Sequence, residues 1–178
     1  MELVSADERD SYFGTFRRVA LHLEMRDTYG VPNEADRFAR FLETGGRGDT
    51  AEATDDDRRT WLTMIRNAVQ AGKTVRRARI VSEPVTDYIR FEWAGTVANV
   101  KAGEEVRWLP RRLASTIALP GNDFWLFDEE TVVFTIFTGA GRVAERQRTT
   151  DPAAVRLCAS AFEAVWSAAI PHEEYRLR

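Results

Sequence analysis

Apolar residues in the first third of the chain recur every three or four positions, which is the spacing of amphipathic helices. The first such stripe consists of Phe13, Phe16, Val19, Ala20 and Leu23. It predicts a helix over residues 8–28 that ends before Gly30. A second apolar cluster predicts a short helix over residues 38–42.

A third helix is predicted to start after the acidic run Asp55–Asp57, which suits a helix N-terminus, and to end at Gly72. The stretch 44–57 before it is polar and rich in glycine, and we expect it to form an exposed loop. Residues 1–72 are therefore predicted to form an all-helical N-terminal segment.

The pattern changes at residues 75–81, which are rich in β-branched side chains and predict a strand. A helix is predicted to begin at Pro84, and Asp151 with Pro152 opens a final helix. Further strands are predicted at 105–109, 124–127, 131–137 and 143–149, the middle two as a hairpin. This order of elements predicts an α/β protein of the α+β type, in which helices pack on the faces of a mixed sheet of about five strands. Residues 73–178 would form the α/β domain, in one compact unit with the N-terminal segment.

Composition sets the broad class of the protein. The 178 residues are 44% hydrophobic and 30% charged, as in an ordinary globular chain. The net charge of −3 argues against direct nucleic-acid binding. No apolar stretch is long enough to cross a membrane. The lone Cys158 and the lack of an export signal lead us to expect a cytoplasmic protein.

The chain is poor in the residues that hold metals or nucleotides. It has two histidines and one cysteine, without the spacing of a zinc site, and it has no phosphate-binding glycine–lysine loop. His22 is expected to be a packed or surface residue of the first helix, and His172 to cap the last one. We therefore predict no metal, no cofactor and no catalytic residue.

The strand at 75–81 carries the most informative charges. Alternation places Arg77 and Arg79 on one face of the strand, opposite Arg76, Ala78 and Ile80. With Arg90, the pair could receive an anionic ligand or an acidic partner. The alternative is that Glu83 and Asp87 form ion pairs with these arginines and serve the structure only.

Two further stretches carry candidate residues. Arg107 lies beside Trp108 in a basic patch, and Arg and Trp are enriched at protein interfaces, although a solvated rim is the alternative. In the strand that follows, Asp123 and Trp125 share a face, and core packing is the simplest interpretation of its aromatic residues. Asp123 could also pair with an arginine. The candidate binding residues are Arg77, Arg79, Glu83, Asp87, Tyr88, Arg90, Arg107, Trp108, Asp123 and Trp125.

Several segments resemble an uncharacterised actinobacterial domain family. They are RRARIVSEPVTDYIRFE from Arg76, GEEVRWLPR from Gly103, DFWLFD from Asp123, HLEMRDTY from His22 and the C-terminal FEAVWSAAIPHEEY. Members of this family are often encoded beside helix-turn-helix regulators. The resemblance therefore implies a regulatory role with a protein partner of that kind.

The chain is also loosely similar to the phospholipase D-like half-domain that serves as a sensor in some transcription regulators. The resemblance rests on the strand pair around an Asp-containing turn and on Phe162, Glu163, Trp166 and Ala169 in the closing helix. Catalytic members of that superfamily carry a histidine and a lysine two residues apart. Neither His22 nor His172 is followed by lysine at that spacing, which implies a binding domain without phosphodiesterase chemistry.

Two functions follow as expectations. The first is a non-enzymatic regulatory or ligand-sensing protein that acts with a DNA-binding transcription regulator. The second is a tailoring or hydrolytic enzyme for small molecules or peptides, which would draw an acid and a base from Glu24, Glu83, Asp87, Tyr88 and Asp123.

Overall fold

A computed structural model of the chain describes residues 1–45 and 56–178. Its helices are α1 (Ala6–Thr15), η1 (Pro32–Glu34), α2 (Ala35–Glu43), α3 (Asp56–Gln70), α4 (Asp87–Ala102), η2 (Arg111–Leu113) and α5 (Pro152–Ala168). Its strands are β1 (Glu2–Leu3), β2 (Val19–Glu24), β3 (Thr74–Val81), β4 (Glu105–Pro110), β5 (Asp123–Phe127), β6 (Thr131–Phe137), β7 (Val143–Thr149) and β8 (Ile170–Pro171). The loop predicted over 44–57 lies largely outside the described residues.

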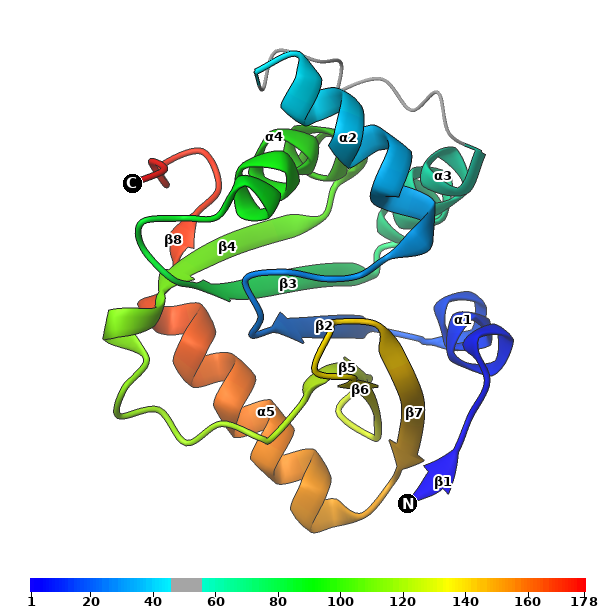
Figure 1. Cartoon of the computed structure of the whole chain (residues 1–178). Coiled ribbons are helices and arrows are strands. Elements are labelled where there is room, and N and C mark those ends of the chain that lie inside the picture. Colours follow the sequence, from blue (N-terminus) through cyan, green and yellow to red (C-terminus); the bar gives the residue numbers. More distant parts are fainter. Residues whose placement is uncertain (46–55) are drawn as a thin grey trace.

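The described strands form one mixed sheet in the order β1-β7-β6-β5-β2-β3-β4-β8 (Figure 1). Strands β2, β3 and β4 are parallel, whereas β5, β6, β7 and β1 are antiparallel neighbours. Strand β2 joins the two halves, because it pairs parallel with β3 and antiparallel with β5. The predicted mixed sheet with helices on its faces is confirmed, although it has eight strands and not about five.

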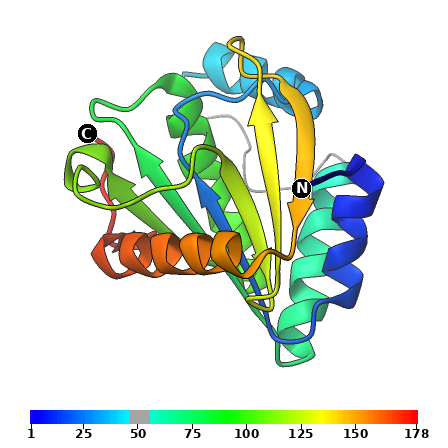
Figure 2. The same cartoon turned by 90° about the horizontal axis from the view of Figure 1, so that it is seen from below.

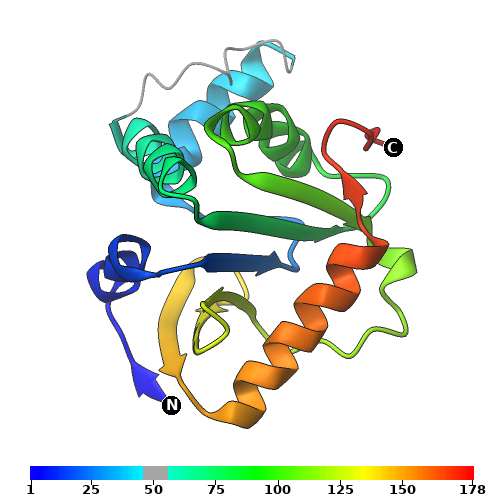
Figure 3. The ribbon, with the colours of Figure 1, turned by 180° about the vertical axis from the view of Figure 1, so that it is seen from behind.

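Each face of the sheet is covered by helices (Figures 2 and 3). Helix α5 lies on one face, where Cys158, Phe162 and Val165 pack against strand residues such as Leu21 and Ile80. The opposite face carries two separate apolar clusters. One cluster joins α1 and α3 to β2, β3 and β5, and the other joins α2 and α4 to β3 and β4.

The helix predicted over residues 8–28 is wrong in its second half. Helix α1 ends at Thr15, and Phe16 after it has an extended backbone, so that residues 19–24 form β2. The apolar residues there fit a helical period, but Leu21 and Leu23 also alternate with Ala20. A central strand is covered on both faces and thus carries apolar residues on both, which obscures its two-residue period. Residues 1–72 are therefore not all helical, and they place β2 in the middle of the sheet.

The later elements follow the sequence pattern more closely. Helix α2, strands β3 to β7 and helix α5 occupy the predicted stretches, and Asp151 caps α5 by accepting from the backbone of Ala153. Helix α4 starts at Asp87 and not at Pro84, because Thr86 caps it by accepting from the Ile89 amide. No helix among residues 1–45 and 56–178 is long and apolar enough to cross a bilayer.

Candidate functional site

A strip of polar side chains crosses the otherwise apolar sheet face between its two clusters. Alternation directs His22 and Glu24 of β2 and Arg77 and Arg79 of β3 to this face. The parallel register places His22 beside Arg77 and Glu24 beside Arg79, and the antiparallel register places Trp125 of β5 beside His22. Side chains from segments distant in sequence thus become direct neighbours.

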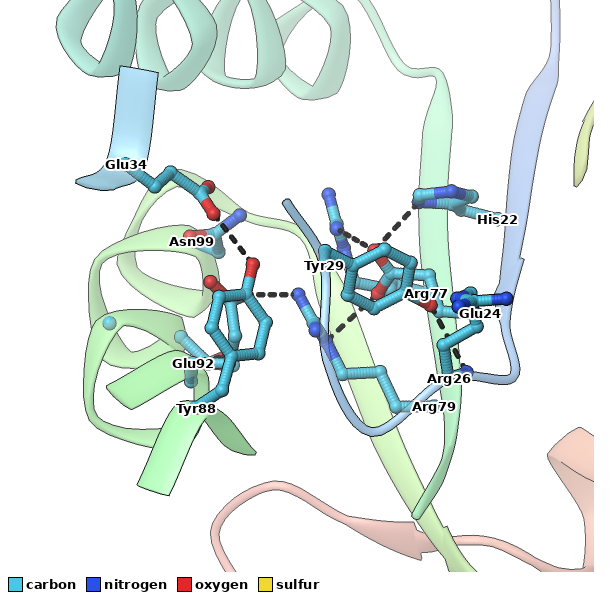
Figure 4. A network of polar contacts seen from close by, with 12 residues as sticks. His22, Glu24, Arg26, Tyr29, Glu34, Arg77, Arg79, Tyr88, Glu92 and Asn99 are labelled. Carbon is cyan, nitrogen blue, oxygen red and sulfur yellow. Dashed lines mark hydrogen bonds and ion pairs between the residues drawn. The ribbon is translucent and has the colours of Figure 1, made fainter. Parts of the chain in front are cut away.

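The two arginines of β3 are held by buried carboxylates (Figure 4). Arg77 Nη1 lies 3.1 Å from Glu24 Oε1, and its Nε donates to Glu104 Oε1 at 2.8 Å. Arg79 Nε lies 2.9 Å from Glu24 Oε2, and its Nη2 donates to Glu92. Burial alone would lower the pKa of both guanidiniums, but the carboxylates outweigh it and raise their pKa. Both arginines are therefore permanently charged and fixed in place.

These partners correct the pairing expected from the sequence. Glu83 instead lies 3.3 Å from Arg112 and accepts from the Tyr175 hydroxyl, while Asp87 lies 3.9 Å from Arg90 on the exposed side of α4. Glu83, Asp87 and Arg90 are thus not neighbours of the arginine pair.

Arg58 of α3 reaches the same strip from above. Its Nη2 donates to the carbonyl of Gly95 and to Asn99 Oδ1, both at 2.6 Å, and Asn99 in turn donates to the fully buried Glu104. Among the described residues no carboxylate forms an ion pair with Arg58. Burial lowers its pKa, with Glu92 opposing. Arg58 is thus a largely buried cation whose direct acceptors are neutral.

His22 is neutral at pH 7 in this setting. Its ring stacks on Trp125 with centroids 4.1 Å apart, and its Nδ1 is buried without a hydrogen-bond partner among the described residues, 3.8 Å from Glu24. Burial, Arg77 and Arg79 hold the pKa of His22 well below its usual value of 6.5. His22 therefore belongs to a strand in the polar strip, and its placement on a helix was wrong.

Two carboxyl groups at the edges of the strip have raised pKa values. Glu34 of η1 accepts from the Tyr88 hydroxyl at 2.6 Å, and burial with the nearby Glu92 raises its pKa to about 7. Asp123 accepts from the Tyr29 hydroxyl at 2.5 Å, and burial raises its pKa to about 6. The pKa of Tyr88 is raised by burial and by Glu92, so its hydroxyl remains a donor.

A pocket of about 240 Å³ opens above this strip, between the sheet and helices α3 and α4. Its aromatic lining comes from Trp61, Phe91 and Trp125, with the His22 ring. Its cationic lining consists of Arg9, Arg37, Arg58, Arg77 and Arg79. The pocket therefore combines aromatic surface with an unusual density of guanidinium groups.

A protein family described as Domain of unknown function (DUF6879) matches residues 7–177. The chain belongs to this family. No curated protein matches it.

Several solved structures resemble this chain in fold. Nuc, a phospholipase D family member from Salmonella typhimurium, is 11% identical, with a TM-score of 0.52, over 93% of this chain and 87% of that one. NucT from Helicobacter pylori is 9% identical, with a TM-score of 0.53, over 96% of both chains. TrmBL2, an archaeal chromatin protein described as having a novel mode of DNA binding, is 15% identical, with a TM-score of 0.51, over 92% of this chain and 48% of that one. At these identities the likeness shows a phospholipase D-like fold and nothing about activity.

The predicted site residues divide into those at the pocket and those elsewhere. Arg77, Arg79 and Trp125 line the pocket. Tyr88 donates to Glu34, which also lines the pocket, and Asp123 accepts from the Tyr29 hydroxyl. Arg107 and Trp108 do not line the pocket. Arg107 stacks on Trp166 on the α5 face, and Trp108 is fully buried against Tyr175. Arg107 and Trp108 therefore do not form the exposed patch considered from the sequence.

The sequence interpretation missed most of the residues that α4 contributes. Glu92, Gly95, Thr96 and Asn99 all line the pocket, and their spacing of three, four and seven places them on one helix face. A polar stripe on a helix that buries Ile89 and Ala98 was the signal that could have identified them. Among the described residues, no group of three or more His, Cys, Asp or Glu side chains is arranged to hold a metal ion.

Proposed function

We propose that this protein is a non-enzymatic ligand-sensing module, that its pocket binds a small anion, and that it acts with a DNA-binding transcription regulator. The observation that carries the proposal is Arg58, a largely buried guanidinium at the pocket whose direct acceptors among the described residues are uncharged. Burying a cation without a charged partner is costly, and a bound anion would remove that cost.

Further donors at the pocket support an anionic ligand. Arg77 uses Nε and Nη1 on carboxylates, and Arg79 uses Nε and Nη2. Arg77 Nη2 and Arg79 Nη1 donate to no described residue. A guanidinium held by carboxylates through two of its nitrogens offers the third in a set direction, which suits a charged acceptor such as a carboxylate.

Support for the regulator partner comes from the fold and the family resemblance. In TrmBL2, the region similar to this chain occupies about half of a DNA-binding protein. Members of the actinobacterial family that the sequence resembles are often encoded beside helix-turn-helix regulators. A sensing domain that reaches DNA only through a partner also suits a chain with a net charge of −3.

Binding is tested by isothermal titration of the purified chain with the sodium salts of acetate, benzoate and inorganic phosphate. The Arg58→Gln variant should weaken binding about 10- to 100-fold, because a charged hydrogen bond contributes about 1.5–3 kcal/mol. Arg66→Gln is the matched control, since Arg66 lies exposed on the same helix. Equal affinities of the two variants for every bound anion, or no binding of any probe, would overturn the pocket as an anion site.

The partner is tested by crosslinking the tagged protein in its own cell and identifying the attached proteins by mass spectrometry. Reproducible enrichment of a helix-turn-helix regulator supports the proposal. Its absence from a sample that contains the regulator at ordinary abundance contradicts it.

Catalysis is a second candidate, favoured by Glu34 alone. A carboxyl group with a pKa of about 7 beside the Tyr88 hydroxyl suits an acid–base role at neutral pH. An enzyme of this kind would turn over a panel of aryl esters and amides, and Glu34→Gln would abolish that turnover. Turnover unchanged by Glu34→Gln would reject this candidate.

A further inference from the structure

We propose that the pocket takes a singly charged aromatic acid together with one proton, and that the proton resides on Glu34. This inference rests on the proposed function, and it names both the chemical class of the ligand and the condition under which it binds.

The charge of the site argues for one negative charge and one proton. The cations around the pocket are Arg37, Arg58, Arg77 and Arg79. Among the described residues, the carboxylates that line it or pair with Arg77 and Arg79 are Glu24, Glu34, Glu92 and Glu104. Arg9 also lines the pocket, and it forms an ion pair with Asp10 at 2.7 Å, which compensates its charge. A bound monoanion would add one negative charge beside these carboxylates, and a single proton on one of them offsets it.

Glu34 is the carboxylate best placed to take that proton. Glu24, Glu92 and Glu104 each lie within 3.1 Å of an Arg77 or Arg79 nitrogen, and such contacts hold a carboxylate in its ionised form. Glu34 instead accepts from the neutral Tyr88 hydroxyl, and its arginine neighbour Arg37 is 3.6 Å away.

The groups that face Glu34 come from several elements. They are Tyr88 and Glu92 of α4, Arg37 of α2, Arg58 of α3, Arg79 of β3 and Arg142, which shares a neighbouring hollow with Glu34. Burial and Glu92 together outweigh Tyr88 and the arginines, so that the pKa of Glu34 lies near 7. An arriving anion adds a second negative neighbour and favours the protonated form further.

The lining of the pocket argues for an aromatic ligand of small size. Trp61 meets Trp125 edge to face with centroids 5.8 Å apart, and the neutral His22 ring stacks on Trp125. Phe91 closes the α4 side. Aromatic rings prefer edge-to-face or offset-stacked contact with another ring. A volume of about 240 Å³ lies below the range of about 300–1,000 Å³ usual for drug-sized ligands, which favours a compact acid with one or two rings.

The experiment compares four probes by isothermal titration at pH 6, 7 and 8. Benzoate is the aromatic monoanion, cyclohexanecarboxylate has the same charge without the planar ring, phthalate carries two charges, and benzyl alcohol carries none. We expect benzoate to bind at least tenfold more tightly than each of the others at pH 6, since aromatic contact and one balanced charge together contribute on the order of 1.4 kcal/mol or more. Benzoate should also bind about tenfold more weakly at pH 8 than at pH 6, because Glu34 must be protonated.

Glu34→Gln keeps an acceptor for Tyr88 and mimics the protonated carboxyl. Its affinity for benzoate should be the same at pH 6 and pH 8, whereas Glu43→Gln, at an exposed position of α2, should retain the wild-type pH dependence. If Glu34→Gln does not fold, the pH dependence of the wild-type protein still decides the proton part of the inference.

The possible failures are distinguishable. Equal binding of benzoate and cyclohexanecarboxylate overturns the aromatic class, and tighter binding of phthalate overturns the single charge. A wild-type affinity independent of pH overturns the proton. In each of these cases an anion still binds through Arg58, so the proposed function survives. Only the absence of binding by every anion, or insensitivity to Arg58→Gln, removes both.

Discussion

Arg79 is one of the least exposed charged residues of the described chain. It forms ion pairs with Glu24 and Glu92, and its guanidinium lies over the ring of Trp108 at 5.5 Å from the centroid. A buried ion pair adds little net stability compared with an apolar pair, but removal of one member leaves the other charge buried and unpaired. The folded state therefore depends on Arg79 more than an isolated surface arginine would suggest.

We expect Arg79→Gln to lower the free energy of unfolding by about 3–5 kcal/mol, because it leaves Glu24 and Glu92 without this cation. Urea denaturation followed by tryptophan fluorescence measures the change. Arg76→Gln is the control, since Arg76 lies on the opposite sheet face and pairs with the exposed Glu105, and its cost should stay below about 1 kcal/mol. Similar small losses in both variants would show that the Arg79 pairs contribute little to folding.

Glu34 gives the stability of the protein a pH dependence of known sign. Its pKa rises from 4.5 to about 7 on folding, so the folded chain holds a proton that the unfolded chain releases. Stability from this group is therefore lost as the pH rises between those values. In urea denaturation, the free energy of unfolding of Glu34→Gln relative to that of the wild type should rise by about 1–3 kcal/mol from pH 5 to pH 8. The corresponding difference for Glu43→Gln should stay constant, and a constant difference for Glu34→Gln would contradict the raised pKa.

The hairpin of β5 and β6 shows how one turn connects distant elements. Asp128 and Glu129 both have positive φ, 53° and 59°, which suits the two-residue turns that join twisted antiparallel strands. The Asp128 carboxylate accepts from the backbone amides of Arg17, Arg18 and Val19 at 2.7–3.1 Å. Burial opposes its ionisation, but these amides lower its pKa. The turn therefore fixes the start of β2 as well as the hairpin.

Glu129→Gly should raise the free energy of unfolding by up to about 1 kcal/mol, because Glu129 is exposed and glycine adopts positive φ without steric cost. Thermal and urea denaturation would both record the gain. Glu130→Gly is the matched control, since that residue lacks a positive φ and forms an ion pair with Arg17, and it should destabilise slightly. A loss of stability in Glu129→Gly would mean that the Glu129 side chain stabilises the folded state although it is exposed.

Elements with strong local signals could be predicted, and β2 could not. The alternation of β3 correctly placed Arg77 and Arg79 on one face of the sheet. The alternation of β5 correctly placed Trp125 on the face opposite Phe124. The partners of the arginines depend on the register of β2 against β3 and on the approach of α3 and α4. Neither is encoded in the spacing of one segment, so Glu92, Glu104 and Arg58 could be assigned to the site only in three dimensions.

At the scale of the whole molecule, Cys158 reports on global opening. Its side chain is fully buried in the cluster between α5 and the sheet, and burial raises the pKa of its thiol to about 12. Thiolate is the reactive form, so the folded protein should be nearly inert to thiol reagents. Labelling by a disulfide reagent should be at least about a thousandfold slower in the native state than in denaturant, as expected for a reaction that requires unfolding by 5 kcal/mol or more. Rapid native labelling would indicate that α5 separates easily from the sheet.

The position of β2 between β3 and β5 has a consequence for synthesis of the chain. Its parallel partner is made soon after it, but its antiparallel partner, Phe127 opposite Ala20, follows about a hundred residues later, and pairing over such a span is slow. Helix α5, which covers Leu21 and Leu23, is made later still. A ribosome that has produced only the parallel half therefore presents an open strand edge and an uncovered apolar face, the surfaces that chaperones bind and that aggregate when translation stops early.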